Sequence, residues 1–311
     1  MSKEIVAGVA GAGVFGGYHA QKYVALKGVR LAAVYDLEGD RAESLARRYG
    51  AVAYSSLAEF LNAVEVVTIA TPASSHFNLA RQALEAGRHV LIEKPIALQT
   101  VHADRLIDMS RNRGLVLQVG HQERFVFEAF GLSGRGARPR SVSCIRRNPT
   151  TGRGEDVSVI FDLMIHDIDL VRSLGFREPV SAMATGEGDQ LEARLAFRDG
   201  ATVSFEASRL ADRRERRMVI EYDDGAVEID FVSRSIANTT THPLNSSFDN
   251  DSEHSALADP LGYGVMRFVE AVAGGSPPPV SGEDGRDALE WALLIENAAR
   301  AAAPERRVAS A

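Results

Sequence analysis

Cysteine is almost absent from this sequence, and its scarcity restricts the chemistry open to the protein. The 311 residues include a single cysteine, Cys144. One cysteine forms no intrachain disulfide and supplies no thiolate cluster for a metal, and this usage fits a reducing compartment. We therefore expect a cytoplasmic protein without structural disulfides.

Long hydrophobic runs and an excess of positive charge are lacking too. No stretch reaches the roughly 20 apolar residues that cross a membrane, and Ile5–Gly17, although apolar, is too rich in glycine for a signal peptide. The 35 Lys and Arg against 42 Asp and Glu give a formal charge of −7. This excess of acidic residues does not indicate a protein that binds nucleic acid. We expect neither a membrane nor a nucleic acid as partner, and a small molecule as substrate.

Short apolar runs alternate with helical patterns over residues 1–120. The expected strands are Ile5–Ala10, Val29–Tyr35, Val52–Tyr54, Val64–Ala70, His89–Ile92 and Leu115–Val119. The expected helices are Phe15–Leu26, Arg41–Tyr49, Leu57–Leu61, Ser75–Ala86 and Val101–Asn112. Apolar strands separated by helices indicate a parallel sheet covered on both faces. Residues 1–120 are thus predicted to form a doubly wound, Rossmann-type domain of the α/β class.

Residues 121–311 have a different pattern, in which strands follow one another with few helices. Gly131–Arg140 is predicted as a loop, Val157–Leu174 as one apolar helix, and Ala237–Asp259 as irregular. The expected strands are Ala182–Thr185, Leu191–Phe197, Thr202–Ala207, Arg217–Tyr222 and Ala226–Phe231, and the closing helices are Leu261–Ala273 and Gly285–Ala302. This pattern predicts a second α/β domain with a large, mostly antiparallel open sheet. Whether the C-terminal helix packs back on the first domain is left open.

A glycine-rich turn, GAGVFG at Gly11–Gly16, follows the first strand and begins the first helix. In a dinucleotide site the first glycine permits the tight turn, the second lets the backbone approach a pyrophosphate, and the third lets helix and strand pack closely. The glycine pattern alone is weak evidence for a dinucleotide site. Here, however, a predicted strand precedes it and a predicted helix follows it, as such a site requires. The predicted cofactor contacts in this turn are Gly11, Gly13, Val14, Phe15 and Gly16.

An acidic residue, Asp36, stands at the end of the second strand, 20 residues after Gly16. A carboxylate there accepts hydrogen bonds from the adenosine ribose hydroxyls and repels a 2′-phosphate. Leu37 follows it, where an NADP site would carry an arginine. The sequence therefore predicts NAD as the cofactor. The alternative role of Asp36, as a helix cap after the strand, is compatible with this one.

A lysine follows another buried strand in the segment Glu93-Lys94-Pro95. Ligands of open α/β sheets bind outside the carboxyl ends of the strands, so we expect Lys94 to point toward the nicotinamide. A partly desolvated lysine can exchange protons with a substrate hydroxyl. The alternative is a solvated lysine at a strand end.

The apolar helix Val157–Leu174 carries one polar stripe. At 100° per residue Asp162, His166, Asp169 and Ser173 share a narrow arc, whereas most of the remaining surface is apolar. Charges on a buried helix need a partner or a polar cavity, which favours a site over a structural histidine. Asp167 lies off the stripe without a functional assignment. The stripe could bind a metal by ligand type, but hydride chemistry beside Lys94 needs none, and we predict no metal.

Together the motifs resemble those of the Gfo/Idh/MocA family, the glucose–fructose oxidoreductase and inositol dehydrogenase group. They are the Gly11–Gly16 turn, Ala70-Thr71-Pro72 with His76, Glu93-Lys94-Pro95 and the Asp162…His166 helix. The resemblance implies a Rossmann domain followed by a substrate-binding domain whose open sheet mediates homo-oligomerisation, as a dimer or tetramer. It also implies that Lys94 and His166 lie at the substrate. The implied additional cofactor contacts are Thr71, Pro72, His76, Glu93 and Gln122.

Two segments, Val119–Phe125 and Asp162–Asp169, together with Arg153-Gly154, are similar to the UDP-N-acetylglucosamine 3-dehydrogenase subgroup of that family. The resemblance implies oxidation at C3 of a UDP-N-acetylhexosamine such as UDP-GlcNAc, for the amino sugars of lipid A and lipopolysaccharide. It makes the chain an NAD-dependent oxidoreductase acting on a nucleotide sugar.

The proposed chemistry assigns roles to the catalytic candidates Lys94, His166 and Asp162. His166 accepts the hydroxyl proton, oriented by Asp162 or by the substrate-side Asp169, and Lys94 stabilises the developing alkoxide; the roles of Lys94 and His166 could be exchanged. Candidates for holding a diphosphate are Arg124, Arg146, Arg147 and Arg153. A second basic run, Arg213, Arg214, Arg216 and Arg217, is interpreted as a solvated strand and turn.

Three alternatives stay open at this level. A dehydrogenase of a free polyol or sugar, of the inositol type, would keep the fold and the cofactor without a phosphate site. An NAD-dependent glycosidase would use transient oxidation and release no net NADH. A non-catalytic NAD-binding regulator would have no need of Lys94 and His166.

Overall fold

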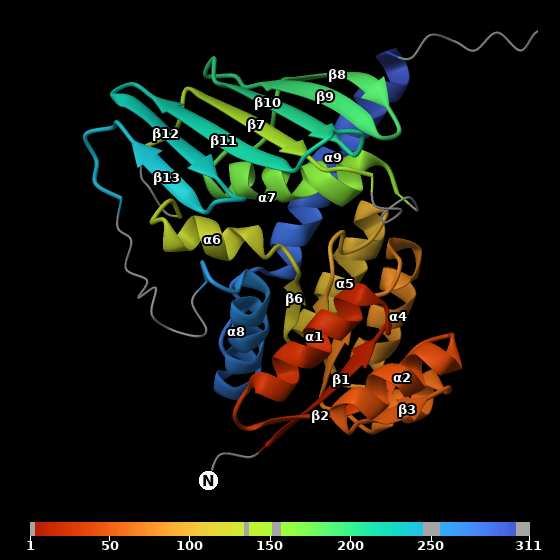
Figure 1. Ribbon diagram of the computed structural model, residues 1–311. Helices are drawn as coiled ribbons and strands as arrows, with labels where there is room; N and C mark the ends of the chain where they lie inside the picture. The colour runs from red at the N-terminus through yellow and green to blue at the C-terminus, as the bar shows by residue number, and fades with distance from the viewer. Residues whose placement is uncertain (1–3, 134–136, 151–156, 245–255, 303–311) are drawn as a thin grey trace, which may run out of the picture. The chain divides into compact units, whose positions relative to one another are not determined.

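The computed structural model describes residues 4–133, 137–150, 157–244 and 256–302 (Figure 1). The chain divides into two compact units, the first formed by Met1–Ala129 and Ser247–Leu289, the second by Phe130–Ser246 and Glu290–Ala311. The division after residue 120 into a cofactor domain and a substrate domain stays a prediction. No helix in the described ranges is long and apolar enough to cross a membrane.

A six-stranded sheet forms the centre of the first unit, with every strand parallel to its neighbours. Its order is β3-β2-β1-β4-β5-β6. The strands are β1 (Ile5–Ala10), β2 (Val29–Tyr35), β3 (Val52–Tyr54), β4 (Val66–Ile69), β5 (His89–Ile92) and β6 (Leu117–Val119). The chain leaves β1 toward opposite sides, first through β2 and β3 and then through β4 to β6, which is the doubly wound topology. The predicted parallel sheet is confirmed.

Helices connect these strands and complete the first unit. They are α1 (Val14–Ala25), α2 (Gly39–Tyr49), α3 (Leu57–Asn62), α4 (Ala73–Glu85), α5 (Thr100–Arg113), α6 (Glu123–Ala129) and α8 (Pro260–Gly274). Local signals end them where expected: α2 and α5 stop at Gly50 and Gly114, which adopt the left-handed conformation that glycine tolerates. Inside, the phenol of Tyr23 on α1 bonds Thr68 on β4 at 2.8 Å, and burial raises the pKa of that phenol well above its usual value.

The second unit contains a seven-stranded sheet of order β13-β12-β11-β7-β10-β9-β8. Its strands are β7 (Ser141–Arg147), β8 (Ser181–Glu187), β9 (Gln190–Ala196), β10 (Thr202–Ser208), β11 (Glu215–Tyr222), β12 (Gly225–Asp230) and β13 (Ser235–Asn238). β7 and β10 pair in parallel, and the other pairs are antiparallel. This arrangement confirms the predicted, mostly antiparallel sheet.

Alternation along the strands gives the second sheet two different faces. Cys144 on β7 and Met218 on β11 are register partners and fully buried, on the face against which a helical segment packs. That segment is the π-helix η1 (Ile160–Met164) followed by α7 (Ile165–Ser173). The opposite face is solvent-exposed and carries Met183, whose exposure is 63%. The last helix, α9 (Gly282–Ala302), begins in the first unit and ends in the second.

Three elements escaped the sequence analysis: α6, β7 and β13. β7 lies at the centre of the sheet, yet its sequence SVSCIRR ends in two arginines, which is typical of a solvent-exposed segment. The predicted single helix at Val157–Leu174 was also wrong in detail. It starts as a π-helix at Ile160 and becomes α-helical only at Ile165. A π-turn contains an extra residue, so the 100° spacing used to place Asp162 does not hold there.

Candidate functional site

The glycine turn between β1 and α1 has the shape of a pyrophosphate site. Gly11 has φ +100°, and a Cβ there would lie 2.6 Å from the carbonyl oxygen of Ala70. A Cβ on Gly16 would overlap the carbonyl oxygen of Gly11, so only glycine lets α1 sit this close to the turn. A Cβ on Gly13 would meet no described atom within 4 Å. The N-terminus of α1 is therefore open to an anion at Gly13, which fits a dinucleotide.

The side chains flanking this turn fit the same ligand. Asp36 at the end of β2 accepts hydrogen bonds from the backbone N–H groups of Ala12, at 2.6 Å, and Glu38, at 2.9 Å. These bonds fix the carboxylate beside the turn, where a ribose would lie. Val14 and Phe15, in the first turn of α1, are 43% and 40% exposed, so both are accessible to a ligand.

His76 on α4 connects the ends of two neighbouring strands. Its Nε2 lies 2.9 Å from the carbonyl oxygen of Thr71, and its Nδ1 lies 2.7 Å from that of Pro95. Burial lowers the pKa of His76, although the two carbonyls and Glu93 oppose that shift. A neutral imidazole donates to one carbonyl only. The Thr71 hydroxyl bonds Ser75, which donates to the carbonyl of Pro72; these contacts hold the β4–α4 turn.

Glu93 at the end of β5 is a buried carboxylate, 7% exposed. Its Oε1 lies 2.7 Å from Nε2 of His19 on α1. Burial alone would raise the pKa of Glu93, but the hydrogen bond with His19 and the positive charge of Lys94 outweigh it, and the pKa is lowered. The carboxylate also lies against Gly120, where a Cβ would be 2.8 Å from Oε1. Glu93 therefore places a fixed negative charge beside Lys94.

The predicted cofactor residues of β1, β2, β4 and β5 gather at one edge of the first sheet, because the carboxyl ends of parallel strands meet there. Lys94 is half-buried at that edge. Gln122 directly precedes α6, and Arg124 on α6 forms an ion pair with Asp284 at 3.3 Å. In the described ranges, no group of three or more His, Cys, Asp or Glu residues could hold a metal ion.

In the second unit, Asp162 lies on η1, and His166 and Asp169 lie on α7. Asp162 and His166 are half-buried, whereas Asp169 is 1% exposed. The buried side chain of Arg209, the residue that follows β10, reaches the start of this segment: its Nη1 lies 3.6 Å from Asp162 Oδ2. Asp162, His166 and Asp169 are thus carried by one continuous helical segment packed on the sheet.

Arg209 was missed by the sequence analysis. Besides Asp162, it contacts Asp189 in the β8–β9 turn, with Nε at 2.8 Å, and donates from Nη2 to the carbonyl of Val157 at 3.1 Å. It thereby joins a strand end, a turn and the start of the helical segment that carries Asp162 and His166. The sequence signal was only an arginine after a strand, and such residues are usually solvated.

Arg146 was predicted to hold a substrate phosphate, and the structure gives it a different role. Its side chain is 1% exposed and makes a bidentate pair with Asp167, from Nε at 2.9 Å and from Nη2 at 2.7 Å. A guanidinium so occupied and so buried is not available to a diphosphate. The pair also accounts for Asp167, because a buried charge needs a partner.

Arg147 lies on the opposite face of the sheet from Arg146, because side chains alternate along a strand. It binds Glu206 at 2.5 Å and Glu215 at 3.0 Å, and the hydrogen bond with Glu206 raises its pKa. Arg147 as a ligand of the substrate diphosphate stays a prediction, and in this structure its guanidinium is paired with these two carboxylates. Arg153 lies outside the described residues.

Comparison with known proteins identifies the family of the chain. Residues 5–121 match the model of an oxidoreductase family with an NAD-binding Rossmann fold, and residues 132–228 match the GFO/IDH/MocA C-terminal domain. The chain belongs to the Gfo/Idh/MocA family of oxidoreductases. It is an NAD-dependent dehydrogenase, and NAD is its cofactor.

Three relatives show how far the similarity extends. The UDP-N-acetylglucosamine 3-dehydrogenase of Acidithiobacillus ferrooxidans is 35% identical over 94% of this chain and 97% of its own. A solved structure of that enzyme gives a TM-score of 0.84 over 96% of this chain and 98% of its own, at 34% identity. GenD2 from gentamicin A biosynthesis, solved with NAD, gives 0.80 at 25% identity over 96% and 95%. The myo-inositol 2-dehydrogenase of Thermotoga maritima is 25% identical over 96% of both chains.

Proposed function

We propose that this protein oxidises the C3 hydroxyl of a UDP-N-acetylhexosamine, such as UDP-GlcNAc, to the 3-keto sugar. The observation that carries the proposal is the 35% identity to a UDP-N-acetylglucosamine 3-dehydrogenase over nearly the full length of both chains. The predicted site residues, Lys94 and His166 among them, carry the chemical groups that such a reaction would need. The product would be a substrate for transamination in the synthesis of lipopolysaccharide amino sugars.

The proposed cofactor contacts are those of the first sheet's edge. Bound at the Gly11–Gly16 turn, NAD⁺ would supply the acceptor for the hydride that leaves the carbinol carbon. Asp36 would bind the adenosine ribose, and its two backbone hydrogen bonds hold it ready to do so. Glu93, ionised and buried, would lie near the nicotinamide, as would Thr71 and Gln122.

His166 is the proposed acceptor of the hydroxyl proton. A neutral imidazole has a pKa near working pH and takes a proton as the carbon loses its hydride. Asp162, fixed by Arg209 at 3.6 Å, orients the start of the helix that carries His166. Lys94 would donate a hydrogen bond to the same oxygen and so stabilise the developing alkoxide. With the hydroxyl proton on His166 and the hydride accepted by bound NAD⁺, the carbinol would become a ketone.

A cytoplasmic location and a homo-oligomeric state complete the proposal. The first is supported by the single cysteine, Cys144, which is buried. Burial, and to a smaller extent the negative charge of Asp167, raises the pKa of its thiol well above the usual value. The second is supported by the solvent-exposed face of the seven-stranded sheet. The inositol dehydrogenase relative favours a second candidate, oxidation of a free polyol at the same site.

The test is NADH formation from NAD⁺ by purified protein across a panel of UDP-sugars and free polyols. A ketone trap is included because oxidation of a carbinol by NAD⁺ is uphill near neutral pH. We expect turnover with UDP-GlcNAc and identification of the 3-keto product by mass spectrometry after borodeuteride reduction. Turnover confined to myo-inositol or other free polyols would overturn the nucleotide-sugar proposal and support the second candidate.

A further inference from the structure

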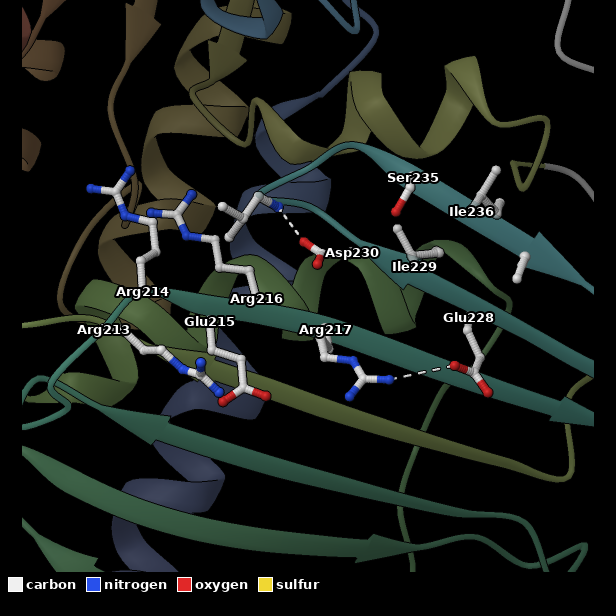
Figure 2. Close-up of a pocket in the computed structure, with 12 residues that line it drawn as sticks. Arg213, Arg214, Glu215, Arg216, Arg217, Glu228, Ile229, Asp230, Ser235 and Ile236 are labelled. Carbon is white, nitrogen blue, oxygen red and sulfur yellow. Dashed lines mark hydrogen bonds and ion pairs between the residues drawn. The ribbon is translucent and has the colours of Figure 1, made fainter.

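Charged side chains of the described ranges lie mostly at the surface, and few of them are buried. The hollow of about 570 Å³ beside β11, β12 and β13 is a surface example (Figure 2). Arg217 Nη2 lies 3.4 Å from Glu228 Oε2 there, and both side chains are about half exposed. Exposed pairs of this kind contribute little to stability. A buried charge is different, because it has lost its water and needs a partner.

His19 and Glu93 form a buried pair at the carboxyl edge of the first sheet. Nε2 of His19 lies 2.7 Å from Oε1 of Glu93, and both side chains are buried. His19 lies on α1, one turn after Gly16, whose missing Cβ lets this helix pack close to the β1–α1 turn. Gly120 lies against the same carboxylate, since a Cβ there would be 2.8 Å from Oε1. The Glu93 side chain is therefore fixed between α1 and the end of β6.

The hydrogen-bond partners of His19 indicate where its proton lies. Nδ1 is buried and has no hydrogen-bond partner among the residues that the structure describes. An imidazolium would bury an Nδ1–H donor without an acceptor, which is costly. A neutral imidazole with its hydrogen on Nε2 avoids that cost and donates to Oε1 of Glu93. The lowered pKa of Glu93, in which burial is opposed first by the hydrogen bond with His19, agrees with an ionised carboxylate.

Two buried histidines hold the residues on either side of Lys94. His19 binds the side chain of Glu93, and Nδ1 of His76 on α4 lies 2.7 Å from the carbonyl oxygen of Pro95. The contact of His76 is with the backbone, so it fixes the path of the chain. The contact of His19 is with a charged group, so it also fixes a charge.

A fixed negative charge beside Lys94 influences the protonation state of that lysine. Lys94 directly follows Glu93, and the two opposite charges attract each other. A neighbouring carboxylate favours the ammonium form, which donates hydrogen bonds and accepts no proton. Without the donor of His19, burial would become the dominant influence on Glu93 and would favour its neutral acid. Lys94 would then lose its anionic neighbour.

We propose that His19 is a positioning residue for Lys94: its hydrogen bond holds Glu93 as a carboxylate, and this carboxylate keeps Lys94 as an ammonium group. Lys94 then donates a hydrogen bond to the substrate oxygen and His166 accepts the proton, so the two roles are not exchangeable. The part that concerns the substrate rests on the proposed function. The charge beside Lys94 does not, and it can be measured without a substrate.

The substrate-free test is trace labelling of the full-length protein with acetic anhydride, followed by mass spectrometry. The chain has four lysines, namely Lys3, Lys22, Lys27 and Lys94. Only a neutral amine reacts, and the exposed Lys27 serves as the internal reference. Relative to Lys27, we expect Lys94 to react about tenfold faster in His19→Leu and in Glu93→Gln than in the wild type. The double variant should react no faster than Glu93→Gln.

A matched pair of amide variants separates the hydrogen bond of His19 from its packing. The side-chain nitrogen of Gln can take the place of Nε2, whereas that of Asn can take only the place of Nδ1. His19→Gln should therefore keep the slow labelling of Lys94, and His19→Asn should lose it. The control is Tyr23→Phe, which removes another buried hydrogen bond of α1, that with Thr68, and should leave the labelling unchanged. This amide pair decides the test if His19→Leu does not fold.

Hydride transfer in a single turnover measures the consequence for the reaction. The substrate is the one that the panel of UDP-sugars and polyols identifies, and NAD⁺ is saturating. We expect hydride transfer about tenfold slower in His19→Leu than in Tyr23→Phe, as when a charge-assisted hydrogen bond is lost. His19→Gln should stay close to Tyr23→Phe.

The results separate this proposal from the proposed function. If Lys94 labels in the folded His19→Asn and His19→Leu variants as it does in Tyr23→Phe, the proposal is overturned. Equal labelling in His19→Gln and His19→Asn overturns it too, because His19 then only fills space. Faster labelling without slower hydride transfer removes the positioning role. If the labelling is as expected but no sugar is oxidised, the charge beside Lys94 stands and the proposed function falls.

Discussion

The two units build their candidate sites by different means. In the first, the backbone makes most of the site: Gly11 and Gly16 are required by contacts with main-chain oxygens, and Asp36 is held by main-chain N–H groups. In the second, side chains from distant strands and turns meet, as Arg209 does with Asp162 and Asp189. A site made of backbone leaves a short local motif in the sequence. A site made of side-chain pairs leaves none.

The largest expected effect concerns the buried pair in the second unit. Arg146→Leu should destabilise the protein by about 3–5 kcal/mol, because it leaves the Asp167 charge buried without its partner. Urea unfolding followed by circular dichroism measures the loss. The variant Arg146→Met/Asp167→Leu, which removes both charges, should be more stable than Arg146→Leu. Equal losses in the two variants would show that the pair is not what holds β7 to α7.

The glycine turn offers a sharper test of the first unit. Gly13→Val places a side chain where no described atom lies within 4 Å, so the fold should tolerate it while the pyrophosphate is excluded. We expect NAD⁺ affinity to fall ~100-fold, or ~2.7 kcal/mol, with little change in melting temperature. Gly16→Val, whose side chain overlaps Gly11, should instead lower stability by about 1–3 kcal/mol. Unchanged NAD⁺ binding by Gly13→Val would contradict the assignment.

A smaller effect is expected at Arg209. Arg209→Leu removes the contacts that fix Asp162 and the carbonyl of Val157, so the helix carrying His166 loses its anchor. We expect kcat/KM for the sugar to fall about tenfold, as when a charge-assisted hydrogen bond is lost, while NAD⁺ affinity stays the same. Asp189→Asn, which keeps the Arg209–Asp162 contact, is the matched control. Wild-type kinetics in Arg209→Leu would remove Arg209 from the site.

The smallest effect is a pH dependence in the first unit. Burial lowers the pKa of His76 below its usual 6.5, so the unfolded chain takes up this proton first as pH falls. Stability therefore declines as pH drops from about 6.5 toward the folded pKa. His76→Gln should lose less melting temperature between pH 7.5 and 5.5 than the wild type. Burial also lowers the pKa of His89, which contributes to the pH dependence in the same range. An equal decline in melting temperature in the wild type and in His76→Gln would assign the pH dependence to other groups.

Much of the first unit could be predicted from the sequence because its signals are local. The strands Ile5–Ala10, Val29–Tyr35 and His89–Ile92 begin and end where their apolar runs do. The contacts of Glu93 with His19 could not be predicted, since they join residues 74 positions apart. The residues around Glu93 in the sequence do not indicate that its partner is His19 on α1.

The second unit shows where such prediction stops. Arg146 and Arg147 are consecutive, yet one is buried against Asp167 and the other binds two glutamates on the opposite face. Their roles depend on the neighbours of β7 in the sheet, and β7 itself was not predicted. The π-turn at Ile160–Met164 also changes the angular position of Asp162 on the helix, because such a turn contains an extra residue.

In the proposed mechanism the backbone of the first unit binds the cofactor, whereas Lys94 and His166 act on the substrate hydroxyl. The direct test is stopped-flow measurement of hydride transfer in a single turnover with UDP-GlcNAc, alongside NAD⁺ titration, for Lys94→Ala and His166→Ala. We expect wild-type affinity for NAD⁺ in His166→Ala and a rate of hydride transfer at least about 100-fold lower in both variants. Hydride transfer at the wild-type rate in either variant would contradict it.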